Sequence, residues 1–217
     1  TPIGSFQGAL APVSAPDLGA AAVAAAVERS AVSAESIEEV VMGCVLPAGL
    51  RQAPARQAAL GAGLPMGTPC TTINKMCGSG MKATMLAHDH ILAGSGRILV
   101  SGGLESMSNA PYLLPKARSG YRLGNGELLD HMFVDGLEDA YEPGKLMGHF
   151  AEDCVKRYGF SREDQDDFAI ESLTRATEAI ENGAFRDEIV NVAVPGRKET
   201  VMIDTDEQPL CANIEKI

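Results

Sequence analysis

TTINKMCGSGMK, residues 71–82, joins a strand pattern to a helix pattern through a tight turn that contains glycine. The segment from Pro69 to Ile73 is rich in Thr and ends in Ile, a composition that favours a strand. Gly78 to Ala93 has a helical pattern and stops before Gly94, a residue that commonly follows a helix end. Cys77 falls in the turn between them. The stretch therefore predicts a strand, a turn and a helix in direct succession.

Strand and helix patterns alternate on both sides of this stretch. Ser14 and Asp17 form a capping box that opens a helix ending near Arg29. The other patterns predict a strand over Glu39 to Val45, a helix over Pro54 to Ala62 and a short buried strand over Arg97 to Ser101. Such alternation is typical of the α/β class with a mostly parallel sheet.

The texture of the sequence changes after Pro115. Residues 116–148 are polar, acidic and rich in glycine without a sustained period, which is typical of a functional lid or an interface loop. A helix is predicted over Phe150 to Arg157, and a second capping box at Ser161 opens a long helix to about Glu181. Two strands are predicted over Glu188 to Val194 and Thr200 to Ile203. Residues 116–217 thus form a separate α+β segment.

Composition excludes several classes of protein. Of the 217 residues 45% are hydrophobic, which argues against disorder. The longest apolar stretch, Leu18 to Val27, is about half of the ~20 residues that a membrane span needs. With 18 basic and 29 acidic residues the net charge is −11, which disfavours nucleic acid as a partner. Five cysteines without framework spacing, and no signal peptide, predict free thiols and a cytoplasmic location.

Cys77 is the candidate nucleophile. A thiol at a helix N-terminus lies beside unpaired N–H groups and the positive end of the helix dipole, and both favour the reactive thiolate. Gly78 and Gly80 leave room for a substrate to approach the backbone. The alternative is that Cys77 is a small hydrophobic residue in a tight turn. The remaining cysteines lack this context: Cys44, Cys70, Cys154 and Cys211.

The helix after Cys77 is apolar nearly all round, which predicts a buried helix with neighbours on several sides. No metal site is expected. His88 and His90 do not share a helix face, and His131 and His149 have no neighbouring ligand pattern. The sequence also lacks the glycine-rich nucleotide-binding motifs.

Several stretches along the whole chain resemble the thiolase family, and within it the acetyl-CoA acetyltransferases. They include TPIGSFQ (1–7), NKMCGSGMKA (74–83), SGGLESMSNAPY (101–112) and EDQDDFA (163–169). The resemblance implies a layered α/β fold of the thiolase type. Residues 1–115 correspond to the family's N-terminal domain without its first strand. Residues 116–217 correspond to a truncated loop domain that covers coenzyme A, and the C-terminal domain is absent.

The resemblance also implies a reaction. Cys77 matches the residue that accepts an acyl group from acetyl-CoA or another acyl-CoA. A Claisen condensation with a second acetyl-CoA then gives acetoacetyl-CoA and free CoA, reversibly. The Cys77 backbone N–H would help to hold the oxyanion, and Leu137 and Met147 match positions near bound CoA. No cofactor is implied beyond CoA as part of the substrate, and a homodimer or homotetramer is the expected assembly.

Two departures from the family pattern leave alternatives open. The family's C-terminal half carries a histidine in Gly-His-Pro and a second catalytic cysteine; no Gly-His-Pro occurs in these 217 residues. The chain alone is therefore expected to be inactive, and a non-catalytic thiolase-like binding module is one alternative. Many biosynthetic members have His where this sequence has Leu146 before Met147. A 3-ketoacyl-CoA thiolase of fatty-acid degradation with broader chain-length specificity is the other.

Overall fold

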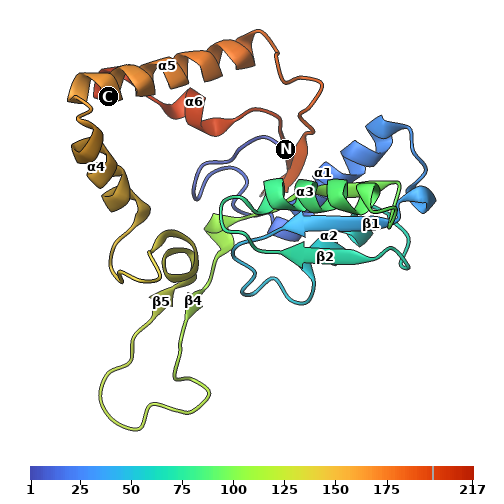
Figure 1. Cartoon of the computed structure of the whole chain (residues 1–217), viewed down its shortest axis with the longest axis horizontal. Helices are drawn as coiled ribbons and strands as arrows, with labels where there is room; N and C mark the ends of the chain where they lie inside the picture. The colour runs from blue at the N-terminus through green and yellow to red at the C-terminus, as the bar shows by residue number, and fades with distance from the viewer. Residues whose placement is uncertain (197) are drawn as a thin grey trace. The chain divides into compact units, whose positions relative to one another are not determined.

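The structure is a computed structural model that describes residues 1–196 and 198–217. It divides into two compact units (Figure 1). The sheet unit comprises Val13–Leu137, and the helical unit comprises Thr1–Pro12 together with Glu138–Ile217. These bounds differ from the division between residues 115 and 116 that the change in sequence texture and the family resemblance both predicted. The assignment of those two segments to domains of the family stays a prediction.

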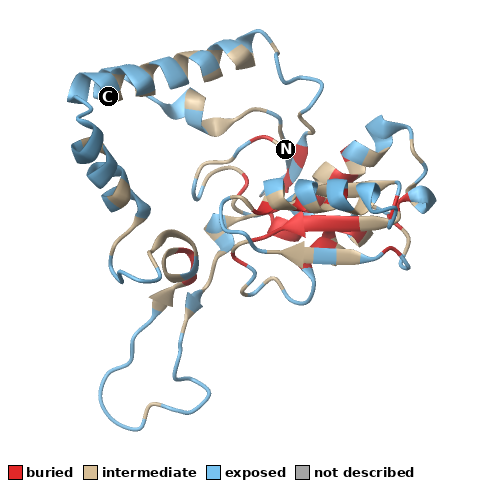
Figure 2. Cartoon of the chain, viewed as in Figure 1, coloured by how far each residue is buried: buried red, intermediate tan, exposed pale blue. Residues whose placement is uncertain are grey.

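A three-stranded parallel sheet forms the centre of the sheet unit. Its order is β2-β1-β3, with β1 at Glu39–Gly43, β2 at Cys70–Ile73 and β3 at Leu99–Gly103. The central strand is buried on both faces, because Val40 and Val41 point to opposite sides and are both shielded from solvent (Figure 2). The α/β class with a parallel sheet is therefore confirmed.

Helices cover both faces of this sheet (Figure 1). One face carries α1 (Ala15–Ser30) and α2 (Pro54–Gly61), and the other carries α3 (Ser79–Leu92). The core cluster combines Val40 and Met42 of β1 with Ala55 and Ala58 of α2. Small residues let α1 and α2 approach closely, since a Cβ on Gly19 would lie 3.0 Å from that of Ala58.

The α3 helix is not enclosed as the sequence predicted. Ala83 and Ala87 are buried towards the sheet, but Met81 and Leu92 are 67% and 74% exposed. Figure 2 shows α3 largely in the colours of exposed and intermediate residues. The expectation of burial on all sides is wrong for this chain, because only one side of the helix meets other elements in the part that the structure describes.

The rest of the sheet unit is mostly irregular. A two-stranded antiparallel ribbon pairs β4 (Tyr112–Leu113) with β5 (Leu129–Asp130), and one π-helical turn, η3 (Phe133–Leu137), follows it. Two single 3-10 turns lie earlier, η1 (Ala34–Ser36) and η2 (Met107–Asn109). The two strands of the ribbon flank a long exposed loop, residues 114–128, in agreement with the irregular structure predicted after residue 115.

The helical unit contains α4 (Met147–Tyr158), α5 (Arg162–Glu181), the antiparallel pair β6 (Val192–Pro195) and β7 (Thr200–Ile203), α6 (Glu207–Cys211) and a final 3-10 turn, η4 (Ile214–Lys216). The capping box predicted at Ser161 is present. The start of the chain is held in this unit by two neighbouring carboxylates. Asp206 accepts a hydrogen bond from the Ile3 backbone N–H at 2.7 Å. Glu207 accepts hydrogen bonds from the backbone N–H groups of Ser5, at 2.8 Å, and Ala9, at 3.0 Å.

Candidate active site

Cys77 lies where the carboxyl ends of the parallel strands meet the start of α3. It is exposed, and it directly precedes Gly78, the N-cap residue of the helix. The first N–H groups of a helix have no partner within it and carry the positive end of its dipole. The carboxyl edge of an open parallel sheet is also where ligands of α/β proteins bind. The structure therefore brings the predicted nucleophile to a location suited to stabilising negative charge.

The residue before Cys77 has an unusual backbone conformation. Met76 has φ = +51°, in the left-handed region that side chains other than glycine rarely adopt. Asn74 holds one side of this turn: its Oδ1 accepts from the Met76 N–H at 2.9 Å, and its Nδ2 donates to the Val45 carbonyl at 3.3 Å. Asn74 thus joins the Cys77 turn to the segment that follows β1.

Ser79 holds the other side of the turn from inside the protein. Its hydroxyl accepts from the Lys75 N–H at 2.8 Å and donates to the Met76 carbonyl at 2.5 Å. The Ser79 N–H donates to the same carbonyl at 2.9 Å. Ser79 is 4% exposed. The peptide groups on both sides of Met76 are therefore fixed by side-chain hydrogen bonds.

Gly43, the last residue of β1, lets α3 approach the sheet. A Cβ placed on Gly43 would lie 2.5 Å from the carbonyl carbon and the Cβ of Ser79. Real side chains do not tolerate such a distance, so the first turn of α3 rests directly on strand backbone. The position of Cys77 is thereby set by backbone contacts as well as by hydrogen bonds.

Glu105, just after β3, binds the segment that follows β1 at the carboxyl edge of the sheet. Its carboxylate accepts from the N–H groups of Val45 and Leu46, at 2.7 and 3.1 Å. The Cys44 thiol also points at it, with Sγ 3.7 Å from Oε1. Burial, and then the charge of Glu105, raise the pKa of the Cys44 thiol to about 12. Cys44 is therefore a neutral thiol at physiological pH.

The five cysteines differ in surroundings. Burial also raises the pKa of the Cys70 thiol, whereas Cys77, Cys154 and Cys211 are exposed. Exposure alone does not single out Cys77, but Cys154 lies within α4 and Cys211 is the last residue of α6. Among the exposed thiols, Cys77 is the one at a helix start.

The second candidate region is the η3 turn, which ends at Leu137. His131 is buried and anchors it: its Nδ1 lies 2.6 Å from Asp135 Oδ2, and its Nε2 accepts from the Ala48 N–H at 3.3 Å. Because Nε2 is an acceptor, Nδ1 carries the proton and donates to Asp135. Gly136 packs on Leu46, since a Cβ there would lie 3.3 Å from a Leu46 methyl carbon. Leu137 is thus tied to the segment that follows β1.

Comparison with known proteins shows the family of the chain. The family model described as "Thiolase, N-terminal domain" matches residues 1–216. The chain belongs to the thiolase family. This thiolase chain is 50% identical over 210 residues to the acetyl-CoA acetyltransferase of Pseudomonas aeruginosa, covering 96% of the chain and 53% of that relative.

Two further relatives of this thiolase carry the same name. Identity is 51% over 208 residues to the acetyl-CoA acetyltransferase of Cupriavidus necator, covering 95% of the chain and 53% of the relative. It is 49% over 219 residues to that of Schizosaccharomyces pombe, covering 100% and 55%. The thiolase chain therefore spans about half the length of the curated relatives it matches.

The predicted contacts of this thiolase with CoA are found on separate units. Leu137 is half-buried at the end of η3 in the sheet unit, and Met147 is exposed at the first residue of α4 in the helical unit. Their roles, and the role of Cys77, stay predictions.

Sequence reasoning missed the residues that hold the turn of the predicted nucleophile, Cys77. Asn74, Ser79 and Glu105 act through hydrogen bonds to backbone groups, some of them far along the chain. Asn74 gave a local signal, since an Asn two residues before a turn often bonds the backbone there. Glu105 gave none, because its partners Val45 and Leu46 are distant in sequence and meet it only when the strands assemble. Ser79 bonds Lys75 and Met76, which lie four and three residues before it, but only the folded turn shows that its hydroxyl faces them.

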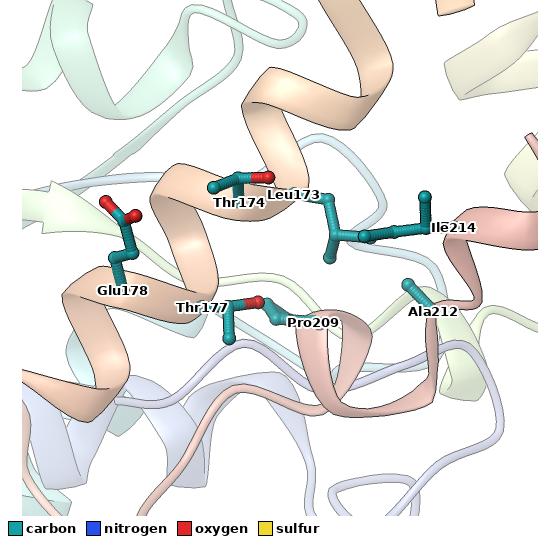
Figure 3. Close-up of a pocket in the computed structure, with 7 residues that line it drawn as sticks. All are labelled: Leu173, Thr174, Thr177, Glu178, Pro209, Ala212 and Ile214. Atoms are coloured by element: carbon teal, nitrogen blue, oxygen red, sulfur yellow. The ribbon is translucent and has the colours of Figure 1, made fainter.

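Other features of the thiolase chain do not add to this site. A hollow of about 290 Å³ lies between α5 and the C-terminal segment. Its lining residues include Leu173, Thr177, Pro209 and Ile214 (Figure 3). None of these is a candidate site residue. Within residues 1–196 and 198–217, no three His, Cys, Asp or Glu side chains are grouped as a metal site, and no helix is both long and apolar enough to cross a membrane.

Proposed function

We propose that the chain carries the acyl-accepting half of an acyl-CoA acetyltransferase, with Cys77 as the nucleophile. The observation that carries the proposal is the exposed Cys77 thiol directly before the N-cap of α3. The helix dipole there stabilises a thiolate and the oxyanion formed when it attacks a carbonyl. The name of the relatives, acetyl-CoA acetyltransferase, supports acetyl-CoA as the substrate.

In the first step the Cys77 thiolate attacks the thioester carbonyl of acetyl-CoA. A carbon–sulfur bond forms to Cys77, the bond to CoA breaks, and CoA leaves as its thiolate. One thioester replaces another, so the exchange is close to balanced and reversible. The Cys77 backbone N–H, at the start of the helix, is the proposed donor to the oxyanion.

In the second step a further acetyl-CoA loses an α-proton, and its carbanion attacks the acetyl group on Cys77. A carbon–carbon bond forms and the Cys77 thiolate is released, which gives acetoacetyl-CoA. A base must take the α-proton, and none is assigned to it among these residues. Because the chain spans about half of its relatives, the step that we ascribe to its own residues is acyl transfer to Cys77.

The remaining parts of the proposal follow the family resemblance and the composition. We propose that Leu137 and Met147 contact CoA, that no prosthetic group takes part, and that the protein acts in the cytoplasm as a homodimer or homotetramer. The acidic net charge of −11 is no obstacle to an anionic substrate, because an anion is held locally by helix N–H groups.

Intact mass spectrometry of the 217-residue chain tests the proposal. Incubation with acetyl-CoA is expected to add about 42 Da, and a large excess of CoA is expected to remove it. The adduct should map to Cys77 and disappear in Cys77→Ala. It should persist in Cys154→Ser, the matched variant at an exposed thiol elsewhere. A folded chain that gains no adduct, while a complete acetyl-CoA acetyltransferase does, contradicts the proposal.

Leu146 favours a second candidate, a thiolase for longer 3-ketoacyl-CoA substrates. It precedes Met147 at the start of α4 and is half-buried, where many biosynthetic members carry His. Acyl transfer to Cys77 from acetoacetyl-CoA and from a longer 3-ketoacyl-CoA separates the two. Faster transfer from the longer substrate supports the second candidate, and a strong preference for acetoacetyl-CoA removes it. CoA binding without any acylation would instead indicate a non-catalytic module.

A further inference from the structure

Ser79 occupies an unusual position for a helix serine. Its side chain is buried at the first turn of α3 and makes both kinds of hydrogen bond that a hydroxyl allows, one accepted and one donated. Both partners are backbone groups of the Cys77 turn: the Lys75 N–H and the Met76 carbonyl. The hydroxyl therefore closes a small ring around the residue just before the nucleophile.

Met76, the residue just before Cys77, is held in a backbone conformation that methionine does not favour. Met76 has φ = +51° without the freedom of glycine or the tolerance of asparagine. A strained backbone of this kind persists only where its surroundings fix it. Asn74 fixes the Met76 N–H, but Asn74 and Met76 are both exposed, so water competes for that bond. The bonds of Ser79 are part-buried and the residue is 4% exposed, so water competes for them less than for the bond of Asn74.

We propose that Ser79 is a positioning residue for the nucleophile: its buried hydroxyl holds Met76 in the left-handed conformation and so sets Cys77 before the first turn of α3. The inference rests on the proposed function, because it takes Cys77 as the reactive thiol. Ser79 acts through the backbone and is not assigned a contact with substrate.

The position of Cys77 depends on Ser79 because of the order of the peptide groups in the turn. The carbonyl of Met76 is part of the peptide bond that joins Met76 to Cys77, and Ser79 binds it with both its hydroxyl and its N–H. Rotation of that peptide group carries the Cys77 N–H and Cα with it. Loss of the hydroxyl releases Lys75 and frees Met76 to return to a common conformation, which moves Cys77 away from the N-terminus of the helix.

Competitive alkylation of the intact chain tests this proposal without any acyl-CoA. Iodoacetamide is applied at fixed pH, and peptide mass spectrometry gives the rates for Cys77, Cys154 and Cys211 in the same molecules. In Ser79→Ala the alkylation rate of Cys77 is expected to fall about tenfold relative to that of Cys154, because two hydrogen bonds that hold the turn are lost. The ratio of Cys154 to Cys211 should not change, although a general loss of structure would change it.

Ser30→Ala is the matched control. The Ser30 hydroxyl also donates to a carbonyl, that of Val27 at 2.8 Å, and accepts from a backbone N–H, that of Val32 at 3.2 Å, but at the end of α1. This variant is expected to leave the Cys77 rate unchanged. Met76→Asn placed in the Ser79→Ala background should recover most of the lost rate, because Asn tolerates positive φ.

A Cys77 rate in folded Ser79→Ala equal to that of the parent chain overturns the inference. If Ser79→Ala does not fold, Met76→Val replaces it, since a β-branched residue adds strain at the same φ while the hydroxyl remains. Slower alkylation of Cys77 then supports the inference, and an unchanged rate overturns it. Failure of acetyl-CoA to modify Cys77 contradicts the proposed function but leaves these alkylation results standing, so the two are distinguishable.

Discussion

Cys44 and Cys77 place the same side chain in opposite surroundings. Cys44 lies in the core, beside the carboxylate of Glu105, where burial and negative charge both disfavour a thiolate. Cys77 lies in the open, beside the positive end of a helix. Position relative to charge and solvent, and not residue type, decides which thiol is a candidate for chemistry.

The raised pKa of Cys44 predicts a loss of stability in alkali. From the ordinary pKa of 9.0 up to about 12, the unfolded chain releases the Cys44 proton while the folded chain keeps it. Unfolding therefore becomes easier as pH rises through this window, by at most about 1.4 kcal/mol per pH unit from this group. Urea unfolding at pH 8 and pH 10 should show a smaller loss in Cys44→Ser, which cannot ionise, than in the parent chain.

Cys154→Ser is the control for that comparison. It removes an exposed thiol of the same chain, so its loss of stability between the two pH values should equal that of the parent. An equal loss in Cys44→Ser as well would mean that the Cys44 thiol is not shielded as the structure indicates.

At the scale of elements, one close approach joins β1 to α3. Gly43→Ala in a strand would ordinarily stabilise slightly by restricting the unfolded chain. Here the new Cβ would lie 2.5 Å from Ser79 backbone, so α3 must move, and overpacking of this kind costs about 1–3 kcal/mol. Urea unfolding should therefore show a net destabilisation, and alkylation of Cys77 should slow because the first turn of α3 shifts.

Gly67→Ala provides the comparison for Gly43→Ala. No atom lies within 4 Å of a Cβ built on Gly67, so this change is expected to be neutral or mildly stabilising. If the two variants unfold at the same urea concentration, the tight contact between β1 and α3 is absent in solution.

The elements that the sequence predicted are those with local signals. Ser14 and Ser161 cap α1 and α5 through the Asp residues three positions on, and the helices begin where these patterns place them. The ribbon of β4 and β5 and the η3 turn carried no such signal. His131, which follows β5, bonds Asp135 four residues on and also Ala48, 83 residues away. The contact with Ala48 exists only after the chain has folded. Cys77 was found from its own neighbours, whereas Glu105 was not, because its partners Val45 and Leu46 lie far along the chain.

At the scale of the whole molecule, the apolar sequence pattern of α3 does not match the solvent exposure of the helix. The sequence makes the helix apolar nearly all round, yet one face meets no other element in the part of the chain that the structure describes. Met81, Met85 and Leu92 recur at spacings of four and seven, so they lie along one face, and they are 67%, 49% and 74% exposed. Contiguous apolar surface of this kind marks a site of association or a tendency to aggregate.

We therefore expect the 217-residue chain, taken alone, to self-associate through this face. Sedimentation velocity should show species larger than 22.7 kDa whose proportion grows with concentration. Met85→Lys combined with Leu92→Lys should shift the chain towards monomer, because two charges on the face oppose its burial. Leu123→Lys is the control: Leu123 is 97% exposed in the loop between β4 and β5, away from the α3 stripe. A monomeric parent chain at every concentration, or equal dissociation by the control, would mean that the α3 face does not drive association.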